Sequence, residues 1–342
     1  MTKPVTLKDI ARETGVHVST VSRALDPNTR TALTEEVVER VQAAAERMGY
    51  RPNRLASGLR TKRTLTVGLM LPDIANTLFP PIVRGAESVL EPKGYASIIV
   101  NTDGDREREG KLVDVLLQRG VDGIIHAAPY RSDPRMIEVH RQGMPMVTVN
   151  RQIENSRIPA VVNDDSGGIA EMLHYLHKAG HRRIAHIAGP QSLSTGRERT
   201  EAFREIAQEL GLDLPEEAIS TAIHYDEDEG RRCTSELLDS GWKFTAILCA
   251  NDRLALGSID ELGANGLSCP KDISVAGFND IPFLDHIPPG LTTIRVQQFD
   301  VGRIGAELLL RMMTEPDASV PMKTIFPVKL IERGSVAKIA TG

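Results

Sequence analysis

From residue 64 onward, short apolar runs alternate with longer stretches in which apolar residues recur at helical spacing. The runs are continuously apolar, which is typical of parallel strands covered on both faces. The first series predicts strands over residues 64–72, 96–102, 122–128 and 145–150, and helices over 79–93, 106–119 and 134–142. The second series predicts strands over residues 161–164, 183–189, 246–252 and 273–280, and helices over 167–179, 197–210, 226–240 and 253–262. Two such series indicate an α/β protein with two doubly wound lobes and a ligand crevice at the carboxyl ends of the strands.

The first 50 residues carry three short helical patterns. The first pattern ends at Gly15, the second covers residues 18–25, and the third covers residues 34–48. Helices this short are unstable alone, so their apolar positions must pack together. These positions are Leu7, Ile10, Ala11, Val21, Ala24, Leu25, Val37, Val38, Val41, Ala44, Ala45 and Met48. Two short helices, a glycine-containing turn and a supporting third helix are typical of a helix-turn-helix, although an unspecialised three-helix bundle has the same pattern.

The second helix of this head presents a polar face that suits DNA. A recognition helix lies in the major groove with its N-terminal residues at the base edges. Small hydroxyls can bond phosphates or bases, Arg23 can bond guanine or phosphate, and Val18 can contact a thymine methyl group. The candidate residues on this helix are Val18, Ser19, Thr20, Ser22 and Arg23.

Residues 51–63 form a basic segment between the head and the lobes. Pro52 prevents the third helix from continuing, and Asn53 can cap a new helix. A helix of only two turns that contains Gly58 is marginal in isolation. The segment is therefore either a basic linker or a helix that forms only on DNA.

Charge is distributed unevenly along the 342 residues. Residues 1–63 contain 12 Lys and Arg against 7 Asp and Glu, a net charge of +5, so the rest of the chain carries -10 of the total of -5. A basic head on an acidic body suits a module that binds a polyanion. Because the chain has no secretory apolar run and no stretch long enough to cross a membrane, we expect a cytoplasmic protein. The three cysteines are odd in number and lack a CxxC pair, so we expect free thiols.

Polar side chains gather where the predicted strands end. The sequences NRQ at 150–152, NDR at 251–253 and FND at 278–280 each follow a strand, and Arg197 and Arg199 open a helix. Amides, a guanidinium and carboxylates in one crevice suit a polyhydroxyl or carboxylate ligand. Asn and Asp at such places are also common turn formers, so the residues alone leave both interpretations open.

The remaining motifs do not indicate catalysis or metal binding. His174, His177 and His181 have helical spacing, but Gly180 is expected to end the helix before the third, so we expect no metal site. The sequence contains no GxxxxGK[ST], GxSxG or HExxH motif, so we expect no cofactor and no enzyme activity. An aromatic content of 4% argues against a protein that stacks single-stranded bases.

Two motifs carry a resemblance to a known family. VTLKDIARETGVHVSTVSRAL at 5–25 and GYRPNRLASGL at 49–59 resemble the LacI/GalR family of transcription regulators, and the similarity extends over nearly the whole chain. The resemblance implies a type I periplasmic-binding-protein-like core. It also implies that residues 53–60 are a hinge helix in the minor groove, where a side chain matching Leu59 wedges between the central base pairs and kinks the duplex.

Pattern and resemblance together assign residues to two sites. The expected DNA-binding residues are Thr6, His17, Val18, Ser19, Thr20, Ser22, Arg23, Asn28, Asn53, Arg54, Ala56 and Leu59. The expected effector-binding residues are Asn76, Phe79, Asn150, Arg199, Asn251 and Asn279. The chain departs from the family at His17, where Ser is usual, at Asn150 and Asn279, where several sugar-binding members have carboxylates, and at Val296, where several have Gln. No particular sugar follows from the resemblance.

The expected domains are a helix-turn-helix at 1–50, a hinge helix and linker at 51–63, and a core at 64–342. The core would divide into a first lobe of residues 64–162 and 295–323 and a second lobe of residues 163–294 and 324–342. The chain would therefore cross between the lobes near Asn163, near Ile294 and shortly before Ile325, with a helix over residues 300–313 returning to the first lobe.

These observations favour a repressor that acts in the bacterial cytoplasm at the nucleoid. It would bind a palindromic double-stranded operator, with its affinity controlled by a sugar, sugar acid or related metabolite in the cleft. The sequence PVKLIERGSVAKIATG at 327–342 predicts a last strand and a short tail, with no leucine heptads beyond it. We therefore expect a homodimer, because a twofold operator needs two heads. The alternatives are a small-molecule-binding protein of sugar-binding type without operator function, which the head opposes, and an enzyme, which lacks a catalytic set.

Overall fold

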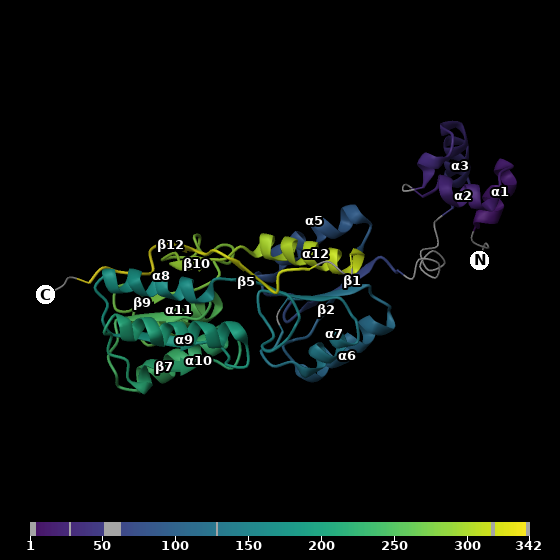
Figure 1. The fold of residues 1–342 in the computed structure, drawn as a ribbon. Coiled ribbons are helices and arrows are strands. Elements are labelled where there is room, and N and C mark those ends of the chain that lie inside the picture. Colours follow the sequence, from purple (N-terminus) through teal and green to yellow (C-terminus); the bar gives the residue numbers. More distant parts are fainter. Residues whose placement is uncertain (1–4, 27–28, 51–62, 128, 316–318, 340–342) are drawn as a thin grey trace. The chain divides into compact units, whose positions relative to one another are not determined.

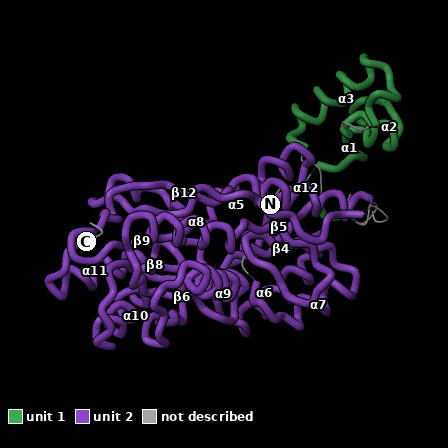
Figure 2. The backbone as a smooth tube through the Cα atoms, turned by 60° about the vertical axis from the view of Figure 1, so that its left-hand side comes forward, with its two compact units in different colours: residues 1–64 green, residues 65–342 purple. Residues whose placement is uncertain are grey.

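The computed structural model describes residues 5–26, 29–50, 63–127, 129–315 and 319–339. The chain forms two compact units, residues 1–64 and residues 65–342, which Figure 2 shows in different colours. The described residues of the first unit form helices and no strand, and the second unit contains all of the strands described.

The first unit consists of α1 (Leu7–Thr14), α2 (Val18–Ala24) and α3 (Glu35–Arg47), with the short 3-10 helix η1 (Arg30–Ala32) before α3. Helix α1 ends at Gly15, whose φ of 69° lies in the left-handed region that favours glycine. Acidic Glu35 and Glu36 occupy the first turn of α3, where the helix dipole stabilises negative charge. The buried core of the head consists of Ile10, Val21, Ala24, Val41, Ala44 and Ala45. The prediction of three helices around a small apolar core is confirmed.

The first lobe of the second unit is built on a parallel six-stranded sheet of order β11-β5-β4-β3-β1-β2. Its strands are β1 (Thr66–Leu71), β2 (Ala96–Asn101), β3 (Gly123–His126), β4 (Met146–Val149), β5 (Ala160–Asn163) and β11 (Lys323–Phe326). Figure 1 shows α5 (Phe79–Leu90) and α12 (Gln298–Thr314) along one face, and α6 (Arg106–Gln118) and α7 (Pro134–Arg141) along the other.

Both faces of this sheet are buried, which explains the continuous apolar runs in the sequence. In β1, Leu69 and Leu71 belong to the core beneath α5 and α12, whereas Met70 belongs to the core that α6 and α7 cover. Neighbouring residues of a strand point to opposite faces, so a strand covered by helices on both sides must be apolar at every position.

Helices α5 and α12 pack so closely that they need glycine at the contact. A Cβ atom added at Gly85 would lie 2.0 Å from the Phe299 carbonyl oxygen, and one added at Gly302 would lie 1.9 Å from the Ile82 carbonyl oxygen. No side chain fits in either place. The two glycines therefore fix the distance between the two helices, although the helices lie far apart in the sequence.

The second lobe has a parallel four-stranded sheet of order β7-β6-β8-β9. Its strands are β6 (Ile184–Ala188), β7 (Ile219–Thr221), β8 (Ala246–Cys249) and β9 (Ser274–Ala276). Its helices are α8 (Asp165–Lys178), α9 (Ser194–Glu209), α10 (Glu227–Asp239) and α11 (Asp252–Ala264), with the 3-10 helix η3 (Glu216–Ala218). The 3-10 helix η2 (Glu91–Lys93) belongs to the first lobe. Strand β7 was not predicted, because three residues at a sheet edge give no periodic signal.

Three segments cross between the lobes. The chain crosses after β5, between β10 (Thr293–Arg295) and α12, and between β11 and β12 (Lys329–Ile331), and β10 pairs with β12 in an antiparallel ribbon. The third crossing was expected before Ile325 but lies after Phe326, because Lys323–Phe326 continues the first sheet by pairing with β5. Within the part of the chain that the structure describes, no helix is long and apolar enough to span a membrane.

Candidate DNA-binding face and effector cleft

Helix α2 has one side in the core of the head and the other side exposed. Val21 and Ala24 are fully buried and pack with Ile10 of α1 and Val41 of α3. The remaining positions and the N-cap form the predicted DNA-binding face, which is polar except for Val18: His17, Ser19 and Arg23 are exposed, and Val18, Thr20 and Ser22 are half-buried. The apolar contacts thus orient the helix and leave a hydroxyl, an imidazole and a guanidinium accessible to a partner.

His17 is the N-cap of α2. Its Nδ1 atom accepts a hydrogen bond from the Ser19 backbone nitrogen at 3.3 Å and lies 2.8 Å from the Ser19 hydroxyl. A ring nitrogen therefore satisfies an orphan donor that a serine oxygen usually satisfies at this position. Because Nδ1 accepts, the proton of the neutral ring lies on Nε2, which makes Nε2 a donor.

Thr6 has a capping role at the start of α1. Its backbone nitrogen and its hydroxyl both donate to the Asp9 carboxylate, at 2.9 and 2.6 Å. The Thr6 side chain is exposed, and with its proton committed to Asp9 it can offer a partner only an acceptor. The other predicted DNA-binding residues lie outside the described residues: Asn28, Asn53, Arg54, Ala56 and Leu59.

Arg199 on α9 joins the strand ends of the second lobe. Its Nε and Nη2 atoms donate to the Asp165 carboxylate at 2.8 and 2.6 Å, and Nη1 donates to the Ala250 carbonyl oxygen. Its guanidinium lies 3.7 Å above the centre of the Phe278 ring. Since Ala250 precedes Asn251 and Phe278 precedes Asn279, these contacts bring three of the predicted effector residues together.

Asn251 and Asn279 also shape the local backbone. Asn251 is the N-cap of α11, and its Oδ1 accepts from the Leu254 backbone nitrogen at 2.8 Å, which leaves its amide N–H groups as donors. Asn279 has a φ of 123°, and its backbone nitrogen donates to the Ile294 carbonyl oxygen at 2.8 Å. Both are at least 95% buried, so the turn-forming and ligand-binding interpretations apply to the same residues.

The first-lobe candidates are less closely joined to this group. Asn150 follows β4 with a φ of 67° and is 4% exposed, and the next residue, Arg151, lies over the Tyr225 ring of the second lobe at 5.5 Å. Asn76 is half-buried, and its Oδ1 accepts from the Leu78 backbone nitrogen within its own loop. Phe79 is 1% exposed and belongs to the core of the first lobe. The structure therefore places Asn150 next to a residue that contacts the second lobe, whereas the printed hydrogen bond of Asn76 and the core contacts of Phe79 lie within the described residues of the first lobe.

Arg151 and Tyr225 contact each other between the lobes and are not among the expected effector residues, although the NRQ sequence that contains Arg151 was noted at a strand end. Burial lowers the pKa of Arg151 to about 10, which still leaves it charged at neutral pH. A charged residue directly after a buried strand was the available signal for Arg151. Tyr225 had no signal, because it lies in the turn before α10, far from any predicted strand end.

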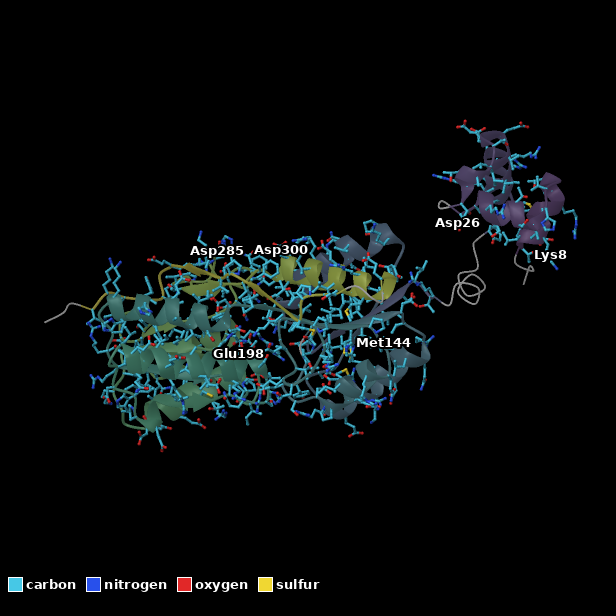
Figure 3. All side chains as sticks on the ribbon, in the orientation of Figure 1. Lys8, Asp26, Met144, Glu198, Asp285 and Asp300 are labelled. Atoms are coloured by element: carbon cyan, nitrogen blue, oxygen red, sulfur yellow. The ribbon has the colours of Figure 1, made fainter. Side chains whose placement is uncertain are left out.

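Two acidic side chains near Arg199 have raised pKa values. Burial raises the pKa of Asp165, and the Arg199 cation opposes that rise. Burial also raises the pKa of Glu198, whose carboxylate accepts from Gln152 Nε2 at 2.7 Å. Glu198 lies at the end of α9 nearest the first lobe (Figure 3), so this bond spans the two lobes.

Two carboxylates next to the predicted site have structural roles. Asp252 accepts from the Thr293 hydroxyl at 2.5 Å and from the Ile281 backbone nitrogen at 2.9 Å, and burial raises its pKa to about 6. Asp280 accepts from Arg295 at 2.6 Å and from Arg333 at 2.7 Å. These bonds anchor the loop after β9 to the crossover ribbon, so the turn-forming interpretation is sufficient for Asp252 and Asp280.

Two further hydrogen bonds join the lobes. Arg253 donates to Asp73 of the first lobe at 3.2 Å. The Gln152 backbone nitrogen donates to the Ser194 hydroxyl of the second lobe at 3.1 Å. A hollow of about 390 Å³ is lined by residues that include Gln152, Glu154, Arg197 and Met322, but not by Arg199 or Asn251. Of the predicted effector residues, Asn76 is half-buried and the other five are at most 5% exposed.

Comparisons with known proteins agree with this architecture. Residues 6–53 match the model of bacterial regulatory proteins of the lacI family, and residues 173–336 match that of a periplasmic binding protein-like domain. The chain is 32% identical over 331 residues to the HTH-type transcriptional regulator RegA of Clostridium saccharobutylicum, covering 96% of this chain and 98% of that protein. It is 30% identical to the ribose operon repressor of Halalkalibacterium halodurans, covering 96% of each.

Solved structures show the same fold. The lac repressor dimer bound to operator and the anti-inducer ONPF aligns with a TM-score of 0.85 at 26% identity and covers 98% of this chain and 100% of that one. A LacI family transcriptional regulator from Enterococcus faecium with bound ribose aligns with a TM-score of 0.69 at 30% identity and covers 80% and 99%. These relatives are transcriptional regulators and not enzymes. The chain therefore belongs to the LacI family of bacterial regulatory proteins.

Proposed function

We propose that this chain is a repressor that binds a palindromic operator as a homodimer and whose operator affinity is set by a sugar, sugar acid or related metabolite in the interlobe cleft. The observation that carries the DNA-binding half of the proposal is the exposed face of α2, with His17, Ser19 and Arg23 on a helix whose other side is buried. Such a protein acts in the cytoplasm, at the nucleoid.

In this proposal α2 lies in the major groove with its N-terminus toward the bases. His17 Nε2–H can donate to a base or phosphate acceptor, and the Arg23 guanidinium can bond guanine through both of its base-edge acceptors. Residues 53–60 would enter the minor groove, where Leu59 would unstack the central step. Two copies are needed for the two halves of a palindrome.

The buried residues of the cleft suit a small polar ligand. Asn251 offers amide N–H groups, and Arg151 and Arg199 offer guanidinium N–H groups. These groups can donate hydrogen bonds to the oxygens of sugar hydroxyls or of a carboxylate. The bound ribose of the Enterococcus faecium neighbour and the ribose operon repressor among the relatives support this class of ligand.

The coupling between the sites would act through the lobes. A ligand shifts operator affinity only to the extent that it binds one lobe arrangement more tightly than the other. The Asp73–Arg253 and Gln152–Glu198 bonds join the lobes when the cleft is closed. Ligand-dependent making and breaking of these bonds would change the geometry of the first lobes, and we propose that the ligand causes release from DNA.

Apolar side chains that are exposed in the single chain support the proposal of a homodimer. Ile223 and Phe283 in the second lobe are 67% and 68% exposed, and Ile74 in the first lobe is 60% exposed. Isolated exposed apolar residues are common, so the test is the mass in solution. Light scattering should give twice the chain mass, and Phe283→Ser should shift the population toward monomer.

The DNA-binding proposal is tested by selecting duplexes from a random pool with the full-length protein and measuring gel shifts of the winners. We expect palindromic sequences and an affinity that falls steeply with salt. Arg23→Ala should weaken specific binding by about 1–3 kcal/mol, whereas Arg40→Ala, an exposed arginine of α3, should cost far less. Equal effects of the two substitutions, or no binding to any duplex at low salt, would refute the assignment of α2.

The ligand proposal is tested by a thermal-shift screen of sugars, sugar acids, nucleosides and phosphorylated metabolites. A ligand at 100 times its Kd stabilises the folded protein by about 2.7 kcal/mol, which is readily visible as a higher Tm. We expect at least one sugar or sugar acid to raise the Tm. A response only to nucleosides would move the ligand to another chemical class.

A further inference from the structure

A buried polar cluster lies in the first lobe, among residues that neither proposed site uses. It consists of Glu109 on α6, His126 at the end of β3 and Asp133 at the start of α7, which are 4%, 1% and 4% exposed. One nitrogen and two carboxylate oxygens, one from each side chain, lie within 4.8 Å of one another. His126 Nε2 is 3.1 Å from a Glu109 carboxylate oxygen.

Among the described residues, two buried atoms of this cluster have no hydrogen-bond partner: His126 Nδ1 and Asp133 Oδ2. Asp133 caps α7, where its Oδ1 accepts from the Met136 backbone nitrogen at 3.0 Å. Its other oxygen, Oδ2, is fully buried without a hydrogen-bond donor among the described residues, and the carboxyl group faces Glu109. Two carboxyl groups that face each other away from water repel unless a cation or a proton lies between them.

We propose that Glu109, His126 and Asp133 form a binding site for one divalent transition-metal ion, with Zn²⁺ as the best match. An imidazole nitrogen with carboxylate oxygens is a donor set that zinc accepts, and three protein ligands leave a fourth position for water. Tetrahedral bonds of about 2.0–2.1 Å place ligand atoms about 3.3 Å apart, close to the observed nitrogen–oxygen separation.

A metal ion bound by this cluster would connect three elements of the first lobe. The cluster joins α6, the end of β3 and the start of α7, and so holds both ends of the loop that leads from His126 to Asp133. Arg131 in this loop donates its backbone N–H to the Ser192 carbonyl oxygen of the second lobe at 2.9 Å. A bound ion would therefore stabilise a loop that contacts the other lobe.

The test uses the full-length protein after treatment with a chelator and removal of the chelator. Isothermal titration with Zn²⁺ measures the stoichiometry and Kd, and Co²⁺ in place of Zn²⁺ reports the ligand geometry through its visible absorption. Asp133→Asn is the informative variant, because Asn keeps the helix cap and removes the charge. The matched control is His174→Gln with His177→Gln, which removes two histidines of α8 at helical spacing outside the cluster.

We expect one high-affinity Zn²⁺ per chain, a higher Tm with metal, and tetrahedral Co²⁺ bands. Asp133→Asn should weaken Zn²⁺ binding by at least tenfold, because removal of a residue that only supports a metal ligand already costs about tenfold in affinity. Circular dichroism should show that the variant remains folded. The α8 control should bind as the unmodified protein does. Absence of saturable binding at one ion per chain, or full binding by Asp133→Asn, would overturn the proposal and leave a shared proton between the carboxyl groups. Neither result depends on DNA or effector binding.

Discussion

At the scale of single residues, His186 of β6 makes the stability of the second lobe depend on pH. It is fully buried, its ring stacks on Phe203 with centroids 4.4 Å apart, and Nδ1 lies 2.7 Å from the Leu248 carbonyl oxygen. Burial lowers its pKa to about 4. The unfolded chain takes up a proton at its ordinary pKa of about 6.5, so the stabilisation is complete above that pH and is lost as the pH falls toward 4.

His186→Asn removes the titrating group and keeps an N–H donor for Leu248. Urea unfolding at pH 7.5 and pH 5 should show that the variant loses about 2 kcal/mol less than the unmodified protein over this interval. His174→Asn, at an exposed position of α8, should leave the pH dependence as it is. An unchanged pH dependence in His186→Asn would mean that His186 does not set it.

Arg199 illustrates a residue whose substitution has two effects. Arg199→Ala leaves Asp165 buried without its partner, and breaking a buried pair costs about 3–5 kcal/mol. We expect Arg199→Ala to lower the Tm strongly, and Arg199→Met with Asp165→Asn to restore most of it. The double variant should then be a folded protein that binds operator but does not respond to the effector, as thermal shift and gel shift would show. A normal effector response in it would remove Arg199 from the site.

Residues with local roles were easier to predict than residues with distant partners. Asn251 follows a strand and precedes a helix, so a capping position could be expected from the sequence. The pairing of Arg199 with Asp165, 34 residues away, could not be expected, because it depends on how α8 and α9 pack. The same is true of Arg151 and Tyr225, which lie in different lobes.

At the scale of elements, the close contact between α5 and α12 makes stability sensitive to the side-chain volume at the glycines of the contact. Gly302→Ala would place a methyl group 1.9 Å from the Ile82 carbonyl oxygen, so the helices must separate. We expect a loss of about 1–3 kcal/mol in the free energy of unfolding. Gly110→Ala is the control, because it lies within α6 with no atom within 4 Å of the added Cβ, and it should stabilise by about 0.5–1 kcal/mol. Denaturant unfolding with the same sign of change in both variants would contradict the close-packing account.

Helices and strands were predicted correctly where the pattern of apolar residues extends over enough residues to show its periodicity. The amphipathic helices and the continuously apolar strands appear in the structure close to their expected positions. The sequence did not indicate the three-residue strands β7 and β10, or strand β11 at the edge of the first sheet. Strand β11 alternates between exposed and half-buried residues, so its membership of the first sheet depends on pairing with β5 rather than on its own apolar pattern.

At the scale of the whole chain, the second unit buries four of the predicted effector residues and joins its two lobes by hydrogen bonds. Asn150, Arg199, Asn251 and Asn279 are at most 5% exposed, and the bonds Gln152–Ser194 and Asp73–Arg253 connect the lobes. Sequence patterns indicated two lobes and a cleft between them, because each strand series repeats the same alternation. They did not indicate the bonds that connect the lobes, since these form between residues such as Asp73 and Arg253 that are 180 residues apart.

The proposed function requires that a ligand bound between the lobes change the affinity of the chain for operator DNA. A fluorescence-anisotropy titration of a selected palindrome with the full-length protein, with and without the ligand that raises its Tm, measures this coupling. We expect two chains per duplex and a Kd that the ligand weakens by about 5–150-fold, the range of ordinary allosteric coupling. A Kd that the ligand leaves unchanged, or equal binding to palindromic and random duplexes, would refute the proposed function.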